Sequence, residues 1–176
     1  MKKKLRILFA AGIVSMSLFA CKKGDTGPEG PPGTANVTYS PWFKPSTYRK
    51  DTIFGIWGFN YDKAEPAITQ AILDSGSVLT FGKLLGYNPS VWPTNRVAQL
   101  PIHLNYKQSG ATQLDTWSSL LTPGNLRIKF VNDNNEYNVI ATQHEFRYII
   151  IPGGQSLTGR SQMTYEEICR KYGIPE

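Results

Sequence analysis

The sequence predicts a mainly β protein, an antiparallel β-sandwich with one or two short peripheral helices. Residues 36–176 contain a series of short runs rich in β-branched and aromatic residues. Clusters of glycine, proline, asparagine and aspartate separate these runs, as turns separate the strands of a sandwich. The chain has only 2 cysteines and 40% hydrophobic residues, so the fold must depend on an apolar core. We therefore expect one domain over residues 36–176.

Seven segments match the strand pattern: residues 37–43, 52–60, 77–84, 98–106, 126–132, 137–141 and 144–151. Apolar and basic residues alternate over 126–130, which is typical of a half-buried strand. The asparagine-rich run at 132–135 favours turn geometry and predicts a hairpin into the next segment. The last segment has too few polar breaks for an edge strand, so we expect it in the interior of its sheet.

A first helix is predicted near Pro66, which would occupy a first-turn position. Ile68, Ile72 and Leu73 then share one face, and Gly76 ends the helix.

A second helix has clearer boundaries. Thr164 and Glu167 have the spacing of a capping box, an apolar face follows from Tyr165, and Gly173 ends the helix. We expect this face to pack on the sandwich and to bury Cys169.

Residues 1–20 have the pattern of an export signal: a basic start, an apolar run of about a dozen residues and a small residue, Ala20, before Cys21. A helix that spans a bilayer needs about 20 apolar residues, so a membrane span is the weaker interpretation. Residues 18–21 resemble the lipobox of bacterial lipoproteins, although Phe19 is bulkier than usual there. We predict that Cys21 is lipidated; the alternative is an ordinary signal peptide with an incidental cysteine.

Residues 21–35 are predicted to be a spacer. A Gly-X-Y period with prolines runs from Gly24 to Gly33, and in collagen this period supports a triple helix. Three triplets are too few to hold a triple helix alone, so an extended spacer of roughly 30 to 40 Å is favoured over a homotrimer.

The charge of the chain argues against nucleic acid as a partner. The full chain has 19 basic and 13 acidic residues, but removal of residues 1–20 would leave 15 basic and 13 acidic residues. A nearly neutral mature protein has no basic surface of the kind that binds nucleic acid.

The sequence contains no recognisable catalytic or metal-binding pattern, so we predict no enzyme, no metal site and no cofactor. His144 and Glu145 begin a zinc-protease motif, but Tyr148 stands where the second histidine is needed. We interpret His103 and His144 as strand residues and Cys169 as a small core residue. A hydrolase with an unrecognised site is an alternative.

The aromatic residues are the remaining candidates for binding. Trp92 lies between prolines in a predicted loop, where its ring would be exposed, and Tyr87 and Trp117 are further candidates. Exposed aromatic faces stack on sugars or anchor protein partners. The alternative is that these rings only fill the core.

The lipobox, the Gly-X-Y stub and the β domain together resemble the collagen-like lipoproteins of Bacteroidota. The likeness extends to residues 66–70 and 72–76, to residues 146–154 and to residues 165–169. This resemblance implies a lipid-anchored protein of the outer membrane, on its periplasmic or cell-surface face, and supplies no active site.

We therefore expect an envelope lipoprotein that acts as a non-enzymatic binding or adhesion module for an unidentified protein or glycan. Two alternatives remain: a glycan-binding accessory protein for polysaccharide uptake, and a structural, trimeric envelope spacer.

Overall fold

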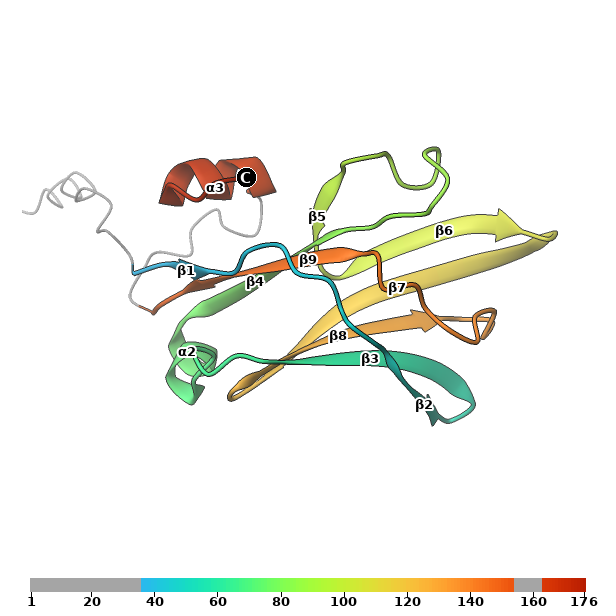
Figure 1. Ribbon diagram of the computed structural model, residues 1–176, viewed down its shortest axis with the longest axis horizontal. Coiled ribbons are helices and arrows are strands. Elements are labelled where there is room, and N and C mark those ends of the chain that lie inside the picture. The colour runs from blue at the N-terminus through green and yellow to red at the C-terminus, as the bar shows by residue number, and fades with distance from the viewer. Residues whose placement is uncertain (1–35, 154–162) are drawn as a thin grey trace, which may run out of the picture. The chain divides into compact units, whose positions relative to one another are not determined.

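Two antiparallel β-sheets pack face to face in the computed structural model, which describes residues 36–153 and 163–176 (Figure 1). This confirms the predicted mainly β sandwich with short helices. The predicted signal peptide, Cys21 and the predicted Gly-X-Y spacer lie outside the described residues. The elements are β1 (Thr38–Tyr39), β2 (Arg49–Ile53), β3 (Ile56–Ala64), α2 (Gln70–Ser75), β4 (Ser77–Lys83), β5 (Val97–Gln99), β6 (Ile102–Gln108), β7 (Ala111–Thr122), β8 (Asn125–Asn132), β9 (Glu145–Ile151) and α3 (Tyr165–Tyr172).

The four-stranded sheet has the order β1-β9-β4-β5 and the five-stranded sheet has the order β2-β3-β8-β7-β6. Strand β9 lies between β1 and β4, which confirms the prediction of an interior strand. The alternation predicted for β8 is also confirmed, because Leu126, Ile128 and Phe130 are buried while Arg127 and Lys129 are partly exposed.

The main core fills the space between the two sheets. Phe146 and Ile150 of β9 belong to the same buried cluster as Ile128 and Phe130 of β8 and Trp117 of β7. Each large apolar side chain removed from water in this way stabilises the fold by roughly 1.5–3 kcal/mol. Because both sheets contribute to one cluster, the sandwich forms a single core between its layers.

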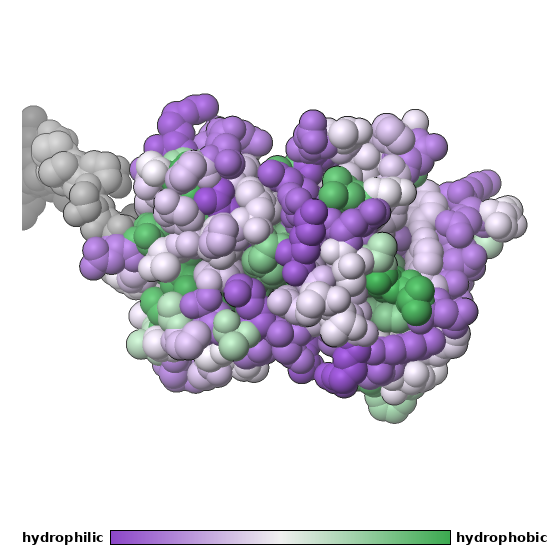
Figure 2. Space-filling view, viewed as in Figure 1, coloured by the Kyte–Doolittle hydropathy of each residue, from purple (hydrophilic) through white to green (hydrophobic). Residues whose placement is uncertain are grey.

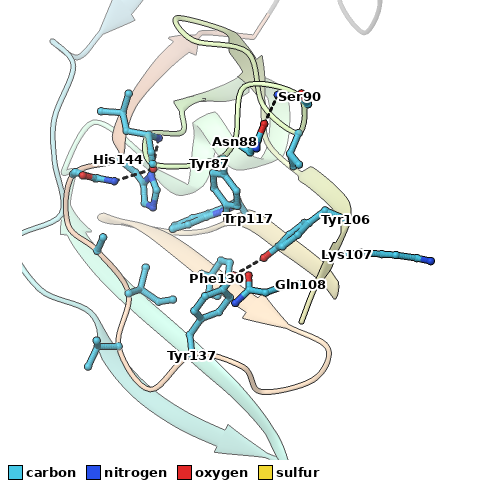
Figure 3. A pocket seen from close by; sticks show the side chains of 17 residues that line it. Tyr87, Asn88, Ser90, Tyr106, Lys107, Gln108, Trp117, Phe130, Tyr137 and His144 are labelled. Atoms are coloured by element: carbon cyan, nitrogen blue, oxygen red, sulfur yellow. Dashed lines mark hydrogen bonds between the residues drawn. The ribbon is translucent and has the colours of Figure 1, made fainter. Parts of the chain in front are cut away.

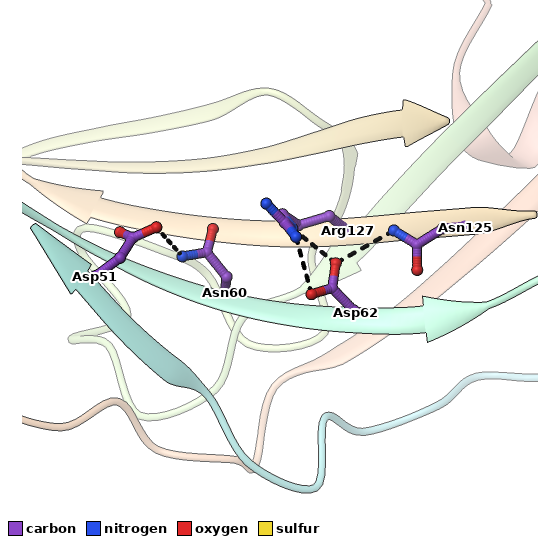
Figure 4. A network of polar contacts seen from close by, with 5 residues as sticks. All are labelled: Asp51, Asn60, Asp62, Asn125 and Arg127. Atoms are coloured by element: carbon purple, nitrogen blue, oxygen red, sulfur yellow. Dashed lines mark hydrogen bonds and ion pairs between the residues drawn. The ribbon is translucent and has the colours of Figure 1, made fainter. Parts of the chain in front are cut away.

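The partly exposed face of the five-stranded sheet carries polar pairs between neighbouring strands (Figure 4). Asp62 of β3 accepts hydrogen bonds from Arg127 Nε at 2.7 Å and Arg127 Nη2 at 3.0 Å across to β8. These bonds hold the pKa of the Asp62 carboxyl below its usual range. Nearby, Asp51 accepts a bond from Asn60 Nδ2 at 2.9 Å. Asp62 and Arg127 occupy directly opposed positions, where opposite charges favour the register, whereas Asp51 and Asn60 are diagonal neighbours across β2 and β3.

Helix α3 covers the other face of the four-stranded sheet. The capping box of Thr164 and Glu167 is present, as predicted, and Gly173 ends the helix in the left-handed conformation. Tyr165, Ile168 and Cys169 are buried, which confirms the predicted packing face. No helix in the described ranges is both long enough and apolar enough to span a bilayer.

Buried Arg147 of β9 ties this helix and the end of the chain to the sheet. Its Nε donates to the Ser40 carbonyl at 2.9 Å, and its Nη1 donates to the Tyr165 hydroxyl and to the Pro175 carbonyl, each at 2.5 Å. One side chain therefore links the start of the domain, α3 and the residues that follow α3.

Two predicted strands are wrong because each spans a break. Residues 52–60 include the tight β2–β3 turn, where Phe54 and Gly55 have φ of 50° and 82°; two positive φ values are what a two-residue hairpin loop requires. Residues 98–106 include Leu100 and Pro101, where the chain passes from the four-stranded to the five-stranded sheet. Pro101 has no N–H to donate to a continuing ladder.

The predicted strand at 137–141 is also wrong, because this segment is part of the loop between β8 and β9. The side chain of Asn132 shapes the start of that loop, since its Oδ1 accepts the N–H groups of Asn134 and Glu136, each at 3.0 Å. The hairpin partner of β8 is instead β7, which precedes it and which the sequence did not predict; β3 pairs with the other edge of β8.

The first helix begins later than predicted. Thr69 is the N-cap of α2, and its side chain accepts the N–H of Ile72 at 3.3 Å. Pro66 therefore precedes the helix and does not occupy its first turn. The end at Gly76 agrees with the prediction.

Candidate functional site

A pocket of about 620 Å³ opens at one end of the sandwich (Figure 3). Its lining comes from the β4–β5 loop, the β8–β9 loop and the last residues of β6, above a floor from β7 and β8. This volume is in the range of small-molecule sites. Figure 2 shows hydrophobic surface over the β8–β9 loop, where Val139 is 80% exposed.

Aromatic rings form the walls and floor of the pocket. Tyr87 and Tyr106 stand nearly perpendicular, with ring centroids 6.2 Å apart and an interplanar angle of 79°. The ring centroids of Tyr137 and Phe130 lie 5.7 Å apart with an interplanar angle of 64°. On the floor, the ring centroids of Phe130 and Trp117 lie 4.6 Å apart. The three tyrosines are partly exposed, whereas the floor residues are buried. The pocket therefore presents ring surfaces from several directions to one volume (Figure 3).

A fully buried carboxylate, Asp115 of β7, lies against this aromatic layer. Its Oδ2 accepts the hydroxyl groups of Tyr87 and Tyr106, each at 2.8 Å, and its Oδ1 accepts Asn132 Nδ2 at 2.8 Å. Asn132 also donates to Gln113 Oε1 at 3.1 Å. The three donors to Asp115 are all neutral groups: two phenol hydroxyls and one amide.

These bonds fix the direction of the tyrosine hydroxyl protons. Tyr106 gives its single proton to Asp115, so Tyr137 must be the donor in the short contact between the Tyr137 and Tyr106 hydroxyls. Tyr87 likewise donates to Asp115 and accepts from Trp117 Nε1 at 3.1 Å. Burial raises the pKa of Tyr87 and of Tyr106 well above the ordinary phenol value, and Asp115 adds to the effect. Each of the three hydroxyl groups can therefore accept a further hydrogen bond but cannot donate one.

His144 completes the floor in a neutral form. It precedes β9, and its Nδ1 accepts the N–H of Leu85 at 3.0 Å, which leaves the ring proton on Nε2. Burial lowers the pKa of His144 to about 4. Its ring lies 4.6 Å from Trp117 and stacks on Tyr87 at 6.1 Å. The pocket thus contains a neutral imidazole, whereas the exposed side chain of His103 on β6 lies beside Thr116, outside the pocket.

The prediction that Trp92 exposes its ring is wrong. The side chain is 4% exposed and belongs to the main core. The cause is a short helical turn in the β4–β5 loop, in which the N–H groups of Val91 and Trp92 both bond to the Asn88 carbonyl. The Arg96 guanidinium then lies 4.7 Å from the Trp92 ring centroid.

Two of the predicted binding residues do meet at one site. Tyr87 and Trp117 line the same pocket, Tyr87 on a wall and Trp117 on the floor. Tyr137 and Asp115 were not predicted, because nothing local in the sequence indicates that they converge with the other residues of the pocket. Cys169 is a buried free thiol, as predicted, and burial raises its pKa.

Comparisons of the chain with family models, with curated proteins and with solved structures gave no match.

Proposed function

We propose that the chain is an envelope lipoprotein, anchored in the outer membrane through Cys21, whose β-sandwich is a non-enzymatic binding module. The ligand occupies the pocket between the β4–β5 and β8–β9 loops. The observation that carries this proposal is the convergence of three tyrosine rings, Trp117 and Phe130 on one volume large enough for a small molecule.

The position of the pocket suits a tethered protein. The chain enters the domain through β1, where Thr38 pairs with Ile150 near the end of β9. His144, at the pocket, precedes the opposite end of the same strand. The described chain therefore enters the sandwich at the end of β9 opposite the pocket.

The binding role can be tested with a variant that fills the pocket. Ala141 is exposed at the pocket rim, so Ala141→Trp should block the volume without disturbing the core. Ala67→Trp is the matched control, because Ala67 is also exposed and lies just before α2. A library of metabolites and saccharides would be screened by thermal shift, since a ligand at a hundredfold excess over its Kd stabilises by about 2.7 kcal/mol.

We expect a compound that raises the Tm of the wild type and of Ala67→Trp but not of Ala141→Trp. A library without such a compound, or one whose active members stabilise all three proteins equally, would contradict the proposed binding site. The anchor is tested separately by mass spectrometry of the protein from its native cells. An amino terminus at Cys21 with attached fatty acids is expected, and an intact Met1 would contradict it.

Glycan capture is a second candidate for the same pocket. The amide side chains of Asn88, Gln108 and Gln143 lie at its rim beside the rings, and this combination suits a sugar with its hydroxyl groups and apolar ring face. A glycan array with Tyr87→Ala as the control tests it. Tyr87 is suitable because it lines the pocket, whereas Trp92 is in the core.

A further inference from the structure

We propose that the pocket binds an organic cation, a ligand with an alkylated ammonium group that lies among Tyr87, Tyr106 and Tyr137 above Asp115. This inference rests on the proposed function and names the chemical class of its ligand. Three observations carry it: an uncompensated buried charge, a set of acceptor-only hydroxyls, and perpendicular ring faces.

The first observation is the charge of Asp115. Its side chain is 0% exposed, and its three hydrogen-bond donors are the neutral groups of Tyr87, Tyr106 and Asn132. Among the described residues, the ion pairs join other carboxylates, those of Glu145 and Asp62. A buried charge is costly without a counter-charge, and neutral hydrogen bonds offset only part of that cost. A cation in the adjacent pocket would supply the counter-charge.

The second observation is the direction of the hydroxyl groups. Because the protons of Tyr87, Tyr106 and Tyr137 are all used within the protein, these groups can only accept from a ligand. Lys107 is the one lysine or arginine in the pocket lining, and its side chain points away from the rings (Figure 3). An anionic ligand would therefore meet only hydroxyl lone pairs, with the buried Asp115 carboxylate behind them, whereas a cation would be attracted to both.

The third observation is the arrangement of the rings. Aromatic faces carry partial negative charge, and a cation within about 6 Å of a ring centroid is attracted to it. Tyr87 and Tyr106 meet at 79°, so they bound the pocket on two sides, while Tyr137 approaches from the β8–β9 loop. Ring faces do not give the six or more oxygen ligands that calcium needs. They suit a bulky ammonium group with apolar substituents.

The remaining lining supports the same class of ligand. Val139, Ile140 and Ala141 give one side of the pocket an apolar surface that would contact alkyl groups on the nitrogen. His144 lies on the floor with its acceptor nitrogen already bonded to Leu85. The volume exceeds that of a small ammonium group, so a longer substituent would extend toward the rim.

The test compares choline with neohexyl alcohol, a neutral molecule of the same shape in which carbon replaces the nitrogen. Binding to the full chain, processed in a bacterial host and extracted in non-ionic detergent, would be measured by calorimetry. We expect choline to bind at least about tenfold more tightly than neohexyl alcohol, the ratio that cation–π attraction in a desolvated site supplies. Equal binding of the two would overturn the inference.

Two variants locate the effect. Tyr137→Leu, which removes a ring, should weaken choline about fivefold or more and leave neohexyl alcohol unchanged within about twofold. Tyr137→Phe, which keeps the ring, should retain most of the preference for choline over neohexyl alcohol. Absence of choline binding together with a saccharide that Ala141→Trp excludes would overturn the cationic ligand while leaving the binding function intact. Absence of any ligand that the pocket-filling variant excludes would overturn both.

Discussion

Acidification should destabilise the domain through His144, which is neutral and buried in the folded protein. Burial lowers the pKa of His144 to about 4, whereas a histidine in an unfolded chain has a pKa of about 6.5. Below about pH 6.5 the unfolded chain therefore binds a proton that the folded protein does not take up until about pH 4. The free energy of unfolding falls across this window, by about 3 kcal/mol in total and by about 2 kcal/mol at pH 5.

Urea unfolding of the wild type and of His144→Asn at pH 7 and at pH 5 measures this contribution. Asparagine is the suitable replacement because its amide oxygen can take the place of Nδ1 as acceptor of the Leu85 N–H. His103, the other histidine of the chain, is present in both proteins and cancels in the comparison. The wild type should lose about 2 kcal/mol more than the variant between the two pH values. Equal losses would refute the assignment of a buried neutral imidazole.

Four further predictions follow from the packing. Arg147→Met should lower the free energy of unfolding by about 3 kcal/mol and expose the C-terminal helix to proteases, because it removes charged hydrogen bonds; Arg170→Met, exposed on the same helix, should not. Trp92→Ala should cost about 3–5 kcal/mol in urea unfolding, as for a core residue, and a loss under 1 kcal/mol would contradict its burial. Cys169 should react with Ellman's reagent only after unfolding, since burial raises its pKa, and rapid reaction of the native protein would disprove this. Thr164→Ala should cost about 1 kcal/mol through loss of the capping box, and Thr164→Ser should restore most of it.

The parts of the fold that the sequence predicted are those with a local cause. Strand β8 was predicted because its alternating residues face core and solvent in turn, and the boundaries of α3 follow from a cap and a glycine that act within one turn of helix. The interior position of β9 followed from its apolar run, which needs cover on both faces. These features depend on residues close in the chain, so no knowledge of the tertiary structure was needed.

The features that were missed depend on contacts between distant residues. Strand β7 places Gln113 and Asp115 on its inward face, where the strand pattern requires apolar residues, so the alternation is hidden. Residues 137–141 have strand-like composition, but the Asn132 side chain holds the preceding turn and directs them into the pocket wall. Trp92 has the flanking prolines of an exposed loop residue, yet the loop folds its ring into the core.

The errors in strand prediction and the candidate site have the same physical origin. A sandwich that only had to be stable could place apolar residues at the positions of Gln113, Asp115 and Asn132, and such replacements of buried polar networks are often neutral or stabilising. Instead these side chains form a connected polar layer at one end of the core, directly beneath the tyrosine rings. The apolar pattern expected of inward-facing strand residues is therefore interrupted at the end of the sandwich that holds the pocket. Such departures from the sequence pattern are expected at functional sites. If the layer served packing alone, a well-packed apolar replacement of its three members would keep every property of the protein. If it serves binding, the same replacement would keep the fold and lose the preference for a cation.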